Sequence, residues 1–294
     1  MTFDAFVGID WSGAAGNYQG VAVAMCGPDR SAPRLVPPPA GSRHWRRAAV
    51  RDWLLDQSTG TRLLVGIDCA FSLPFDRAAG YFEHEATAPD LWALVDRVCA
   101  GDADLLGTGF VVAPGFGGGF WRTGTRDPAF VLPQRGTERA CRADGLGMPE
   151  SPYKLIGPRQ VGKGTLAGMR LLHALTTQAG ERIAVWPFQS ADDGRTVVVE
   201  IYPRLFLRRT GYGNLKVRTW AGLERTLTAL GCEPGNAADQ DPSRPLTDHE
   251  TDALVSAAGL RLLASQPETW APPAMNARAR RQEGWIFGVG LPRH

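Results

Sequence analysis

Two short segments of the sequence, Val7–Asp10 and Val65–Asp68, repeat the same four residues, Val-Gly-Ile-Asp. Each is an apolar run that ends in an acid, which is typical of a buried strand reaching the edge of a sheet. If the two strands are parallel neighbours, equivalent residues lie roughly 5 Å apart. The Asp10 and Asp68 carboxylates then meet at the carboxyl edge, where open α/β sheets bind ligands. Close carboxylates repel each other unless a proton or a cation lies between them. The pair therefore predicts a site for Mg²⁺ or Mn²⁺, which prefer oxygen ligands.

Further acids occur where a charge needs an explanation. Glu200 interrupts the apolar run 197–202, where it is costly unless it is paired or bound to a metal. Asp248 and Asp252 lie four residues apart in a predicted helix and so share a face, with His249 nearby. Each acid alone also has a structural explanation, such as a turn cap, a helix start or an ion pair. We expect metal ligands at Asp10, Asp68, Asp252 and Asp248, catalytic residues at Asp10, Asp68, Glu200 and Asp252, and an acid or base at His249.

The elements that must position these residues follow an α/β pattern. The chain has 294 residues, of which 44% are hydrophobic and 21% charged, as in ordinary globular proteins. We expect one α/β domain over residues 1–294, with a large insertion at approximately 72–182. Its glycine-rich stretch, 107–124, is either a flexible lid or an ordinary tight loop. Predicted strands cover 4–10, 20–25, 34–36, 63–68, 183–187, 197–202 and 284–289, and predicted helices cover 42–57, 89–99, 166–178, 220–230 and a long segment from 247.

Charge, leader and cysteine patterns exclude several classes of protein. The net charge of +2 does not mark the whole chain as a nucleic-acid or membrane binder. The N-terminus lacks a signal-peptide pattern, and no run approaches the ~20 apolar residues of a membrane span. We therefore expect a cytoplasmic protein. The five cysteines are far apart, which argues against a zinc site or a disulfide framework and predicts buried free thiols.

The segment Gly157–Thr165 resembles a phosphate-binding P-loop, with G-x-x-x-x-G-K followed by Gly-Thr. A P-loop follows a buried strand, and the residues before Gly157 form a poor strand pattern. We expect instead that Arg159 and Lys163, near a helix N-terminus, hold a substrate phosphate. An ordinary helix-start loop is the other interpretation. Arg135, Glu138 and Arg139 in the predicted insertion are further candidates for lining the site.

Seven segments together resemble the domain of unknown function 429 family, which is classed as predicted ribonuclease-H-like nucleases. They are VGIDWSG (7–13), GIDCAFSLP (66–74), KLIGPRQVGKGTLAGMRLL (154–172), VWPF (185–188), VEIYPRL (199–205), DHETDALVSA (248–257) and EGWIFGV (283–289).

The resemblance implies a ribonuclease-H-like α/β fold, with a mixed five-stranded sheet of three antiparallel and two parallel strands flanked by helices. It also implies that Asp10, Asp68 and Asp252 occupy metal-binding positions, with Glu200 and Asp248 near them. We expect a divalent-metal-dependent nuclease that hydrolyses phosphodiesters in nucleic acid. The alternatives are a nucleotide-dependent phosphotransferase that uses the Gly157–Thr165 loop and a non-catalytic nucleic-acid-binding module.

Overall fold

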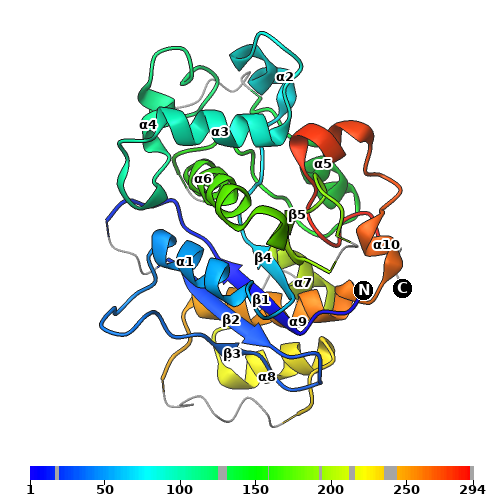
Figure 1. Cartoon of the computed structure of the whole chain (residues 1–294). Helices are drawn as coiled ribbons and strands as arrows, with labels where there is room; N and C mark the ends of the chain where they lie inside the picture. Colours follow the sequence, from blue (N-terminus) through cyan, green and yellow to red (C-terminus); the bar gives the residue numbers. More distant parts are fainter. Residues whose placement is uncertain are drawn as a thin grey trace.

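The fold is built around a mixed six-stranded sheet with helices on both faces (Figure 1). The structure is a computed structural model that describes residues 1–16, 20–124, 131–157, 159–191, 194–211, 216–234 and 244–291. The strand order is β3-β2-β1-β4-β6-β5. One half is antiparallel: β1 (Ala5–Asp10), β2 (Ala22–Cys26) and β3 (Arg34–Leu35). The other half runs parallel to β1: β4 (Leu63–Ile67), β6 (Thr196–Glu200) and β5 (Ile183–Val185).

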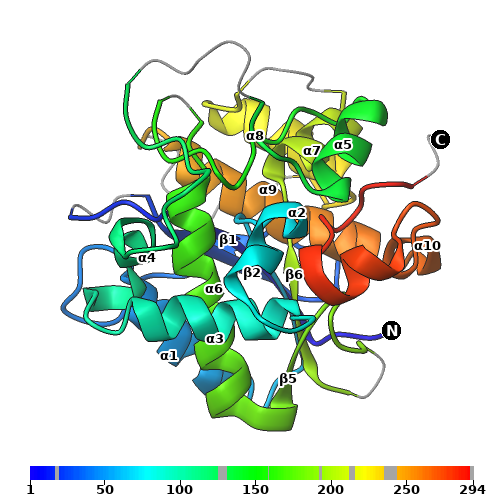
Figure 2. The ribbon, with the colours of Figure 1, turned by 90° about the horizontal axis from the view of Figure 1, so that it is seen from above.

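Each face of the sheet is covered by its own layer of helices (Figures 1 and 2). The first layer holds α1 (Arg47–Gln57), α3 (Ala88–Val98) and α6 (Gly162–Ala179). The second holds α7 (Pro203–Arg209), α8 (Trp220–Ala229) and α9 (Asp248–Ala264). Side chains alternate between the two layers, so Ile9 and Ile67 enter one core while Phe6 and Leu64 enter the other. Burial on both faces explains why these strands are apolar throughout.

Short helices connect the main elements around this framework. They are α2 (Phe75–Ala78), α4 (Thr108–Val112), α5 (Gly136–Ala143) and α10 (Pro267–Trp270), with 3-10 turns at Ala79–Tyr81, Ala103–Leu105 and Gly180–Arg182 and a π-helical turn at Ala279–Glu283. The glycine-rich stretch 107–124 contains α4 and buries Phe110 and Phe120 in the first core. The described part of that stretch is therefore packed against the domain.

Two expectations about the sheet differ from the structure. The sheet has six strands where five were expected, because β5, β6 and β4 are all parallel neighbours beyond β1. The predicted strand at 284–289 is wrong, since the segment forms only an isolated bridge between Ile286 and Glu200. Gly284 and Gly288 adopt positive φ values of 78° and 94°, which turn the chain out of an extended path. The apolar residues of this segment are buried in a turn instead.

Two other sequence observations can be compared with the described residues directly. All five cysteines are buried with free thiols, as predicted. No helix in the described ranges is both long enough and apolar enough to cross a membrane.

A glycine contact brings the late helix α9 directly onto the first strand. A Cβ atom on Gly8 would lie 2.3 Å from the carbonyl oxygen of Ala253 and 2.7 Å from the backbone nitrogen of Ala257. Any larger residue would therefore push α9 away from β1. The close approach positions the first turn of α9 beside the carboxyl end of β1, where Asp10 lies.

Candidate metal centre

Asp10 and Asp68 take equivalent positions at the carboxyl edge of the sheet. The register of β1 and β4 pairs Ile9 with Ile67, and the Asp68 backbone N–H donates to the Ile9 carbonyl oxygen at 2.9 Å. Both side chains line a cavity of about 400 Å³. The repeated Val-Gly-Ile-Asp segments therefore form the parallel pair that their sequence predicted.

The N-terminal part of α9 adds three more predicted residues to this cavity: Asp248, His249 and Asp252. The helix begins here because Thr247 and Glu250 form a capping box, in which each side chain binds the backbone N–H of the other residue. Asp248 is already paired with Lys216 and lies 3.5 Å from the guanidinium of Arg218. The bond to Lys216 lowers the pKa of Asp248, so this carboxylate is neutralised by protein cations.

Asp10 forms a hydrogen bond with His249, which lies 239 residues later in the sequence. The His249 Nδ1 atom lies 2.6 Å from Oδ2 of Asp10, a short hydrogen-bonding distance. Burial raises the pKa of Asp10, and the bond to Asp10 raises the pKa of His249. The two groups therefore share a proton at the edge of the cavity, with the imidazole about half exposed.

The side-chain carboxylates of Asp68 and Asp252 have no hydrogen bond or ion pair with any residue in the described ranges. Both are partly exposed, and both face the same cavity. Burial and the negative charge of neighbouring acids raise the pKa of Asp68 well above its usual range. Burial, reinforced by Asp10, raises the pKa of Asp252 to about 7. The cavity thus contains two unpartnered carboxylates whose charges are unfavourable without a cation.

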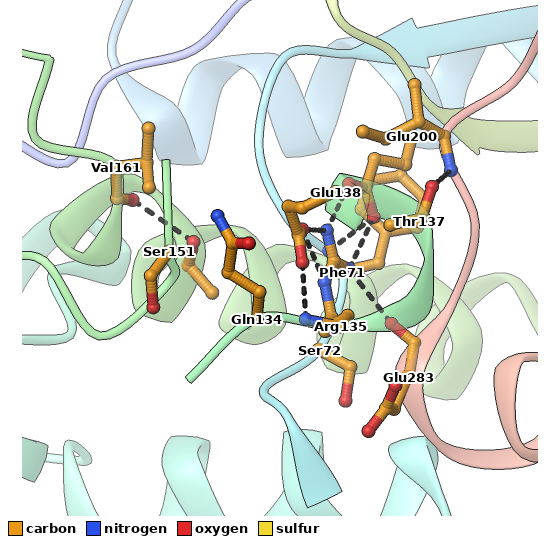
Figure 3. Close-up of polar contacts among 12 residues, drawn as sticks. Phe71, Ser72, Gln134, Arg135, Thr137, Glu138, Ser151, Val161, Glu200 and Glu283 are labelled. Carbon is orange, nitrogen blue, oxygen red and sulfur yellow. Dashed lines mark hydrogen bonds and ion pairs between the residues drawn. The ribbon is translucent and has the colours of Figure 1, made fainter. Parts of the chain in front are cut away.

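Glu200 is positioned differently from the other predicted acids. It lies in register with Ile67, one residue before the level of Asp68, so alternation directs its side chain to the other face of the sheet, where it still lines the same cavity. Both of its oxygens are bound by Arg135, at 2.5 and 2.8 Å (Figure 3). The Phe71 backbone N–H also donates to the carboxylate at 3.0 Å. Because both of its oxygens are occupied by Arg135, we assign Glu200 a positioning role instead of the predicted direct contact with a metal.

Arg135 is the hub of a buried polar network that joins four segments (Figure 3). It is 1% exposed and binds Glu138 and Glu200 together with the carbonyl oxygen of Glu283. Two carboxylates and a carbonyl satisfy its charge and its donors, as a buried guanidinium requires. Arg135 and Glu138, which the sequence marked as lining candidates, do line the cavity, but the pairing of Arg135 with Glu200 depends on a contact 65 residues apart.

The two predicted phosphate-binding residues differ in position. Lys163, in the first turn of α6, lines the cavity beside Gly164 and has no ion pair with a described residue. The loop after Asp10 touches this turn, because a Cβ on Gly13 would lie 2.0 Å from the Lys163 carbonyl carbon. Arg159 is 72% exposed and paired with Glu150 at 2.9 Å. Only Lys163 therefore lies near Asp10.

The segment Gly157–Thr165 leads into a helix, as a P-loop does, but it is not preceded by a strand in the described residues. The helix begins at Gly162, and Lys154 makes only an isolated bridge to Trp121. Position 158 lies outside the described residues, and no strand occurs in the described part of 153–161. The segment therefore lacks the strand–loop–helix arrangement that gives a P-loop its geometry.

The donor chemistry of the cavity suits a hard divalent cation. Asp10, Asp68 and Asp252 supply only carboxylate oxygens, which Mg²⁺ and Mn²⁺ favour. Within the described ranges, no three His, Cys, Asp or Glu side chains already form a group that could hold a metal ion. A cation would thus have to draw these carboxylates together, and Asp10 would adjust its bond to His249.

Comparisons with known proteins add no relative to this picture. No family model, no curated protein and no solved structure matches the chain. The function proposed next therefore rests on the side chains and contacts of the chain itself.

Proposed function

We propose that this chain is a divalent-metal-dependent nuclease of the ribonuclease-H-like type, which hydrolyses phosphodiester bonds in nucleic acid. The mixed sheet, with its three antiparallel and three parallel strands, is compatible with that fold class. The observation that carries the proposal is the pair of unpartnered carboxylates, Asp68 and Asp252, beside Asp10 in one cavity.

Asp10, Asp68 and Asp252 would hold the cation. Their charges are held close by the backbone, through the β1–β4 register and the Gly8 contact with α9, so a cation offsets repulsion that already exists. When bound, a divalent cation lowers the pKa of water and stabilises the leaving oxygen of a phosphodiester. Asp248 remains paired with Lys216, so its negative charge is neutralised and does not add to the repulsion in the cavity.

Lys163 would hold the phosphate of the substrate. It is the cation of the cavity that lacks an ion pair with a described residue, and it lies at the N-terminus of an 18-residue helix. The partial positive charge of that terminus adds to the charge of the ammonium group. The phosphate would then lie between Lys163 and the carboxylate-bound cation.

His249 would move a proton at Nδ1, the atom bound to Asp10. Its raised pKa keeps a proton available near neutral pH, where a general acid or base is effective. Glu200 and Arg135 act indirectly, by fixing the backbone that follows β4 through the Phe71 N–H.

Metal binding is the first test, measured by calorimetric titration of Mn²⁺ into the wild-type chain and into Asp68→Asn. We expect binding to the wild type and at least a ~10-fold loss of affinity in the variant. The exposed, unpaired Glu83 supplies the matched control, Glu83→Gln, which we expect to bind like the wild type. Equal binding by all three proteins would contradict the assignment of the cavity as the metal site.

Hydrolysis is the second test, measured with Mn²⁺ and fluorescent single- and double-stranded DNA and RNA. We expect cleavage by the wild type and by Glu83→Gln, and none by Asp68→Asn. Metal binding without cleavage of any polymer would favour the non-catalytic nucleic-acid-binding alternative. Tight ATP binding that Lys163→Ala abolishes would favour the phosphotransferase.

A further inference from the structure

The cavity that contains the acids continues into a second one. The second cavity has a volume of about 310 Å³, against about 400 Å³ for the first. The two share eight lining residues, which form a common middle section: Asp68, Pro149, Glu150, Val161, Tyr202, Lys216, Asp248 and Asp252. The two unpartnered carboxylates therefore lie inside a continuous groove, with space on both sides of them.

The strand order fixes the direction of this groove. Along the carboxyl edge, Asp10 follows β1, Asp68 follows the neighbouring β4, and Tyr202 follows β6 on the far side. The first lobe runs from Trp11, Ser12 and Gly13, which follow β1, across to Glu200 and Ile201 at the end of β6. The second lies toward β6 and α7. The groove thus crosses three strands, roughly 10 Å from β1 to β6, with Asp68 at its centre.

The lobes differ in chemistry, but each offers positive charge. Lys163 and the first turn of α6 line the first lobe. Arg204 lines the second, together with Arg159, which is paired with Glu150, and with the apolar side chains of Leu207 and Val217. Each lobe is within the usual size range of a pocket for one small molecule. A ligand that fills both lobes can therefore present anionic groups to the cations of each lobe and an apolar group to Leu207 and Val217.

We propose that the substrate is a single-stranded polynucleotide, DNA or RNA, that lies through both lobes and is cut at an internal phosphodiester. The inference rests on the proposed nuclease function. A free mononucleotide would use only one lobe. The two lobes, of about 400 and 310 Å³, are pockets of small-molecule size, so a flexible strand fits into them whereas a stiff duplex does not. A flexible strand can enter, and its unpaired bases can pack against the apolar wall and Tyr202.

The test compares substrates with and without ends, in Mn²⁺. The probes are circular single-stranded DNA, circular single-stranded RNA, a relaxed circular duplex and bis(p-nitrophenyl) phosphate, a small phosphodiester. We expect the small ester to be hydrolysed and at least one type of single-stranded circle to be opened. The duplex circle should be cut at least ~10-fold more slowly, because its bases cannot leave the stack without cost.

The second lobe is tested separately by binding of a fluorescent 12-nucleotide strand, with Ca²⁺ in place of Mn²⁺. We expect Arg204→Gln to weaken binding and to lower the slope of log Kd against log salt by about 0.7, the value for one lost phosphate contact on a single strand. The matched control is Arg208→Gln, one turn further along α7, where the side chain binds the Gly145 carbonyl oxygen outside the groove. Its slope should equal that of the wild type.

Each result has one meaning. Opening of single-stranded circles with a reduced slope in Arg204→Gln supports the inference, and the polymer that is opened identifies DNA or RNA. Hydrolysis of the small ester with intact circles, shortening of linear strands only from their ends, or equal cutting of the duplex overturns the inference and leaves the nuclease proposal standing. An unchanged slope in Arg204→Gln would mean that the strand does not contact the second lobe, which overturns the proposal that it lies through both lobes. Failure to hydrolyse even the small ester overturns the proposed function and the inference with it.

Discussion

The Asp252 carboxylate gives a direct measurement of the repulsion in the cavity, because its ionisation opposes folding. Its pKa in the folded protein is about 7, raised first by burial and then by Asp10, whereas an Asp in an unfolded chain has a pKa of roughly 4. The folded state therefore holds this proton more tightly. Stability falls as the pH rises from about 4 to about 7, and the loss is complete above that range.

The size of the effect follows from the same two values. A difference of about 3 pH units corresponds to about 4 kcal/mol, at ~1.4 kcal/mol for each unit. Water in the cavity reaches the carboxylate, which is partly exposed, and screening reduces the expected effect to about 1–2 kcal/mol. We expect Asp252→Asn, which keeps the shape and removes the charge, to be more stable than the wild type by this amount at pH 8 and equal to it at pH 4.

The assay is urea unfolding in the absence of divalent metal, followed by the fluorescence of the nine tryptophans. The free energy of unfolding is measured at pH 4, 5.5 and 8 for the wild type, Asp252→Asn and the control Glu83→Gln. Saturating Mn²⁺ should reverse the order at pH 8, because only the wild type retains the full carboxylate set. At a metal concentration of 100 times Kd the wild type gains about 2.7 kcal/mol. If Asp252→Asn is no more stable than the wild type at pH 8 without metal, the carboxylates do not repel each other and the reasoning fails.

Three further predictions concern the contacts that hold the site in place. Arg135→Met should lower the free energy of unfolding in urea by about 3–5 kcal/mol, since it leaves buried carboxylates without their partner; a change below about 1 kcal/mol would contradict a buried hub. In NMR titrations the His249 ring should show a pKa above its ordinary value, and Asp10→Asn should return it toward that value; identical titration curves in the two proteins would exclude the His249–Asp10 bond in solution. Gly8→Ala should cost about 1–3 kcal/mol or more by forcing β1 and α9 apart. The control Gly60→Ala, where no atom lies within 4 Å of the added methyl group, should be nearly neutral, and urea unfolding measures both variants.

The sequence predicted those features of the site that depend on local pattern. The Val-Gly-Ile-Asp repeats indicated two strands whose ends carry acids, and the structure pairs them in parallel with Asp10 and Asp68 level. The helical pattern from 247 predicted α9, which presents Asp252 close to His249. In these cases the periodicity of the apolar residues, together with the residues that mark the ends of a strand or helix, is sufficient to position the side chain.

Features that depend on distant contacts were not predictable in the same way. Glu200 stands in an apolar strand like Asp10 and Asp68, but its register sets it level with Ile67, and a shift of one residue reverses the face of a strand. Its partner, Arg135, comes from a helix that the hydrophobic pattern did not indicate. The apolar segment 284–289 has the composition of a strand, and only its glycine backbone angles and its single bridge show that it turns.

The contact between Gly8 and α9 also decides when the site can exist during synthesis. β1 and β4 leave the ribosome long before α9, which contributes Asp252 and His249 from the last fifth of the chain. A nascent chain that ends before α9 has Asp10 and Asp68 but no helix to close the cavity over them, and its β1 face is open to water. For the nuclease proposed above, this order of synthesis keeps the site incomplete until α9 packs onto β1.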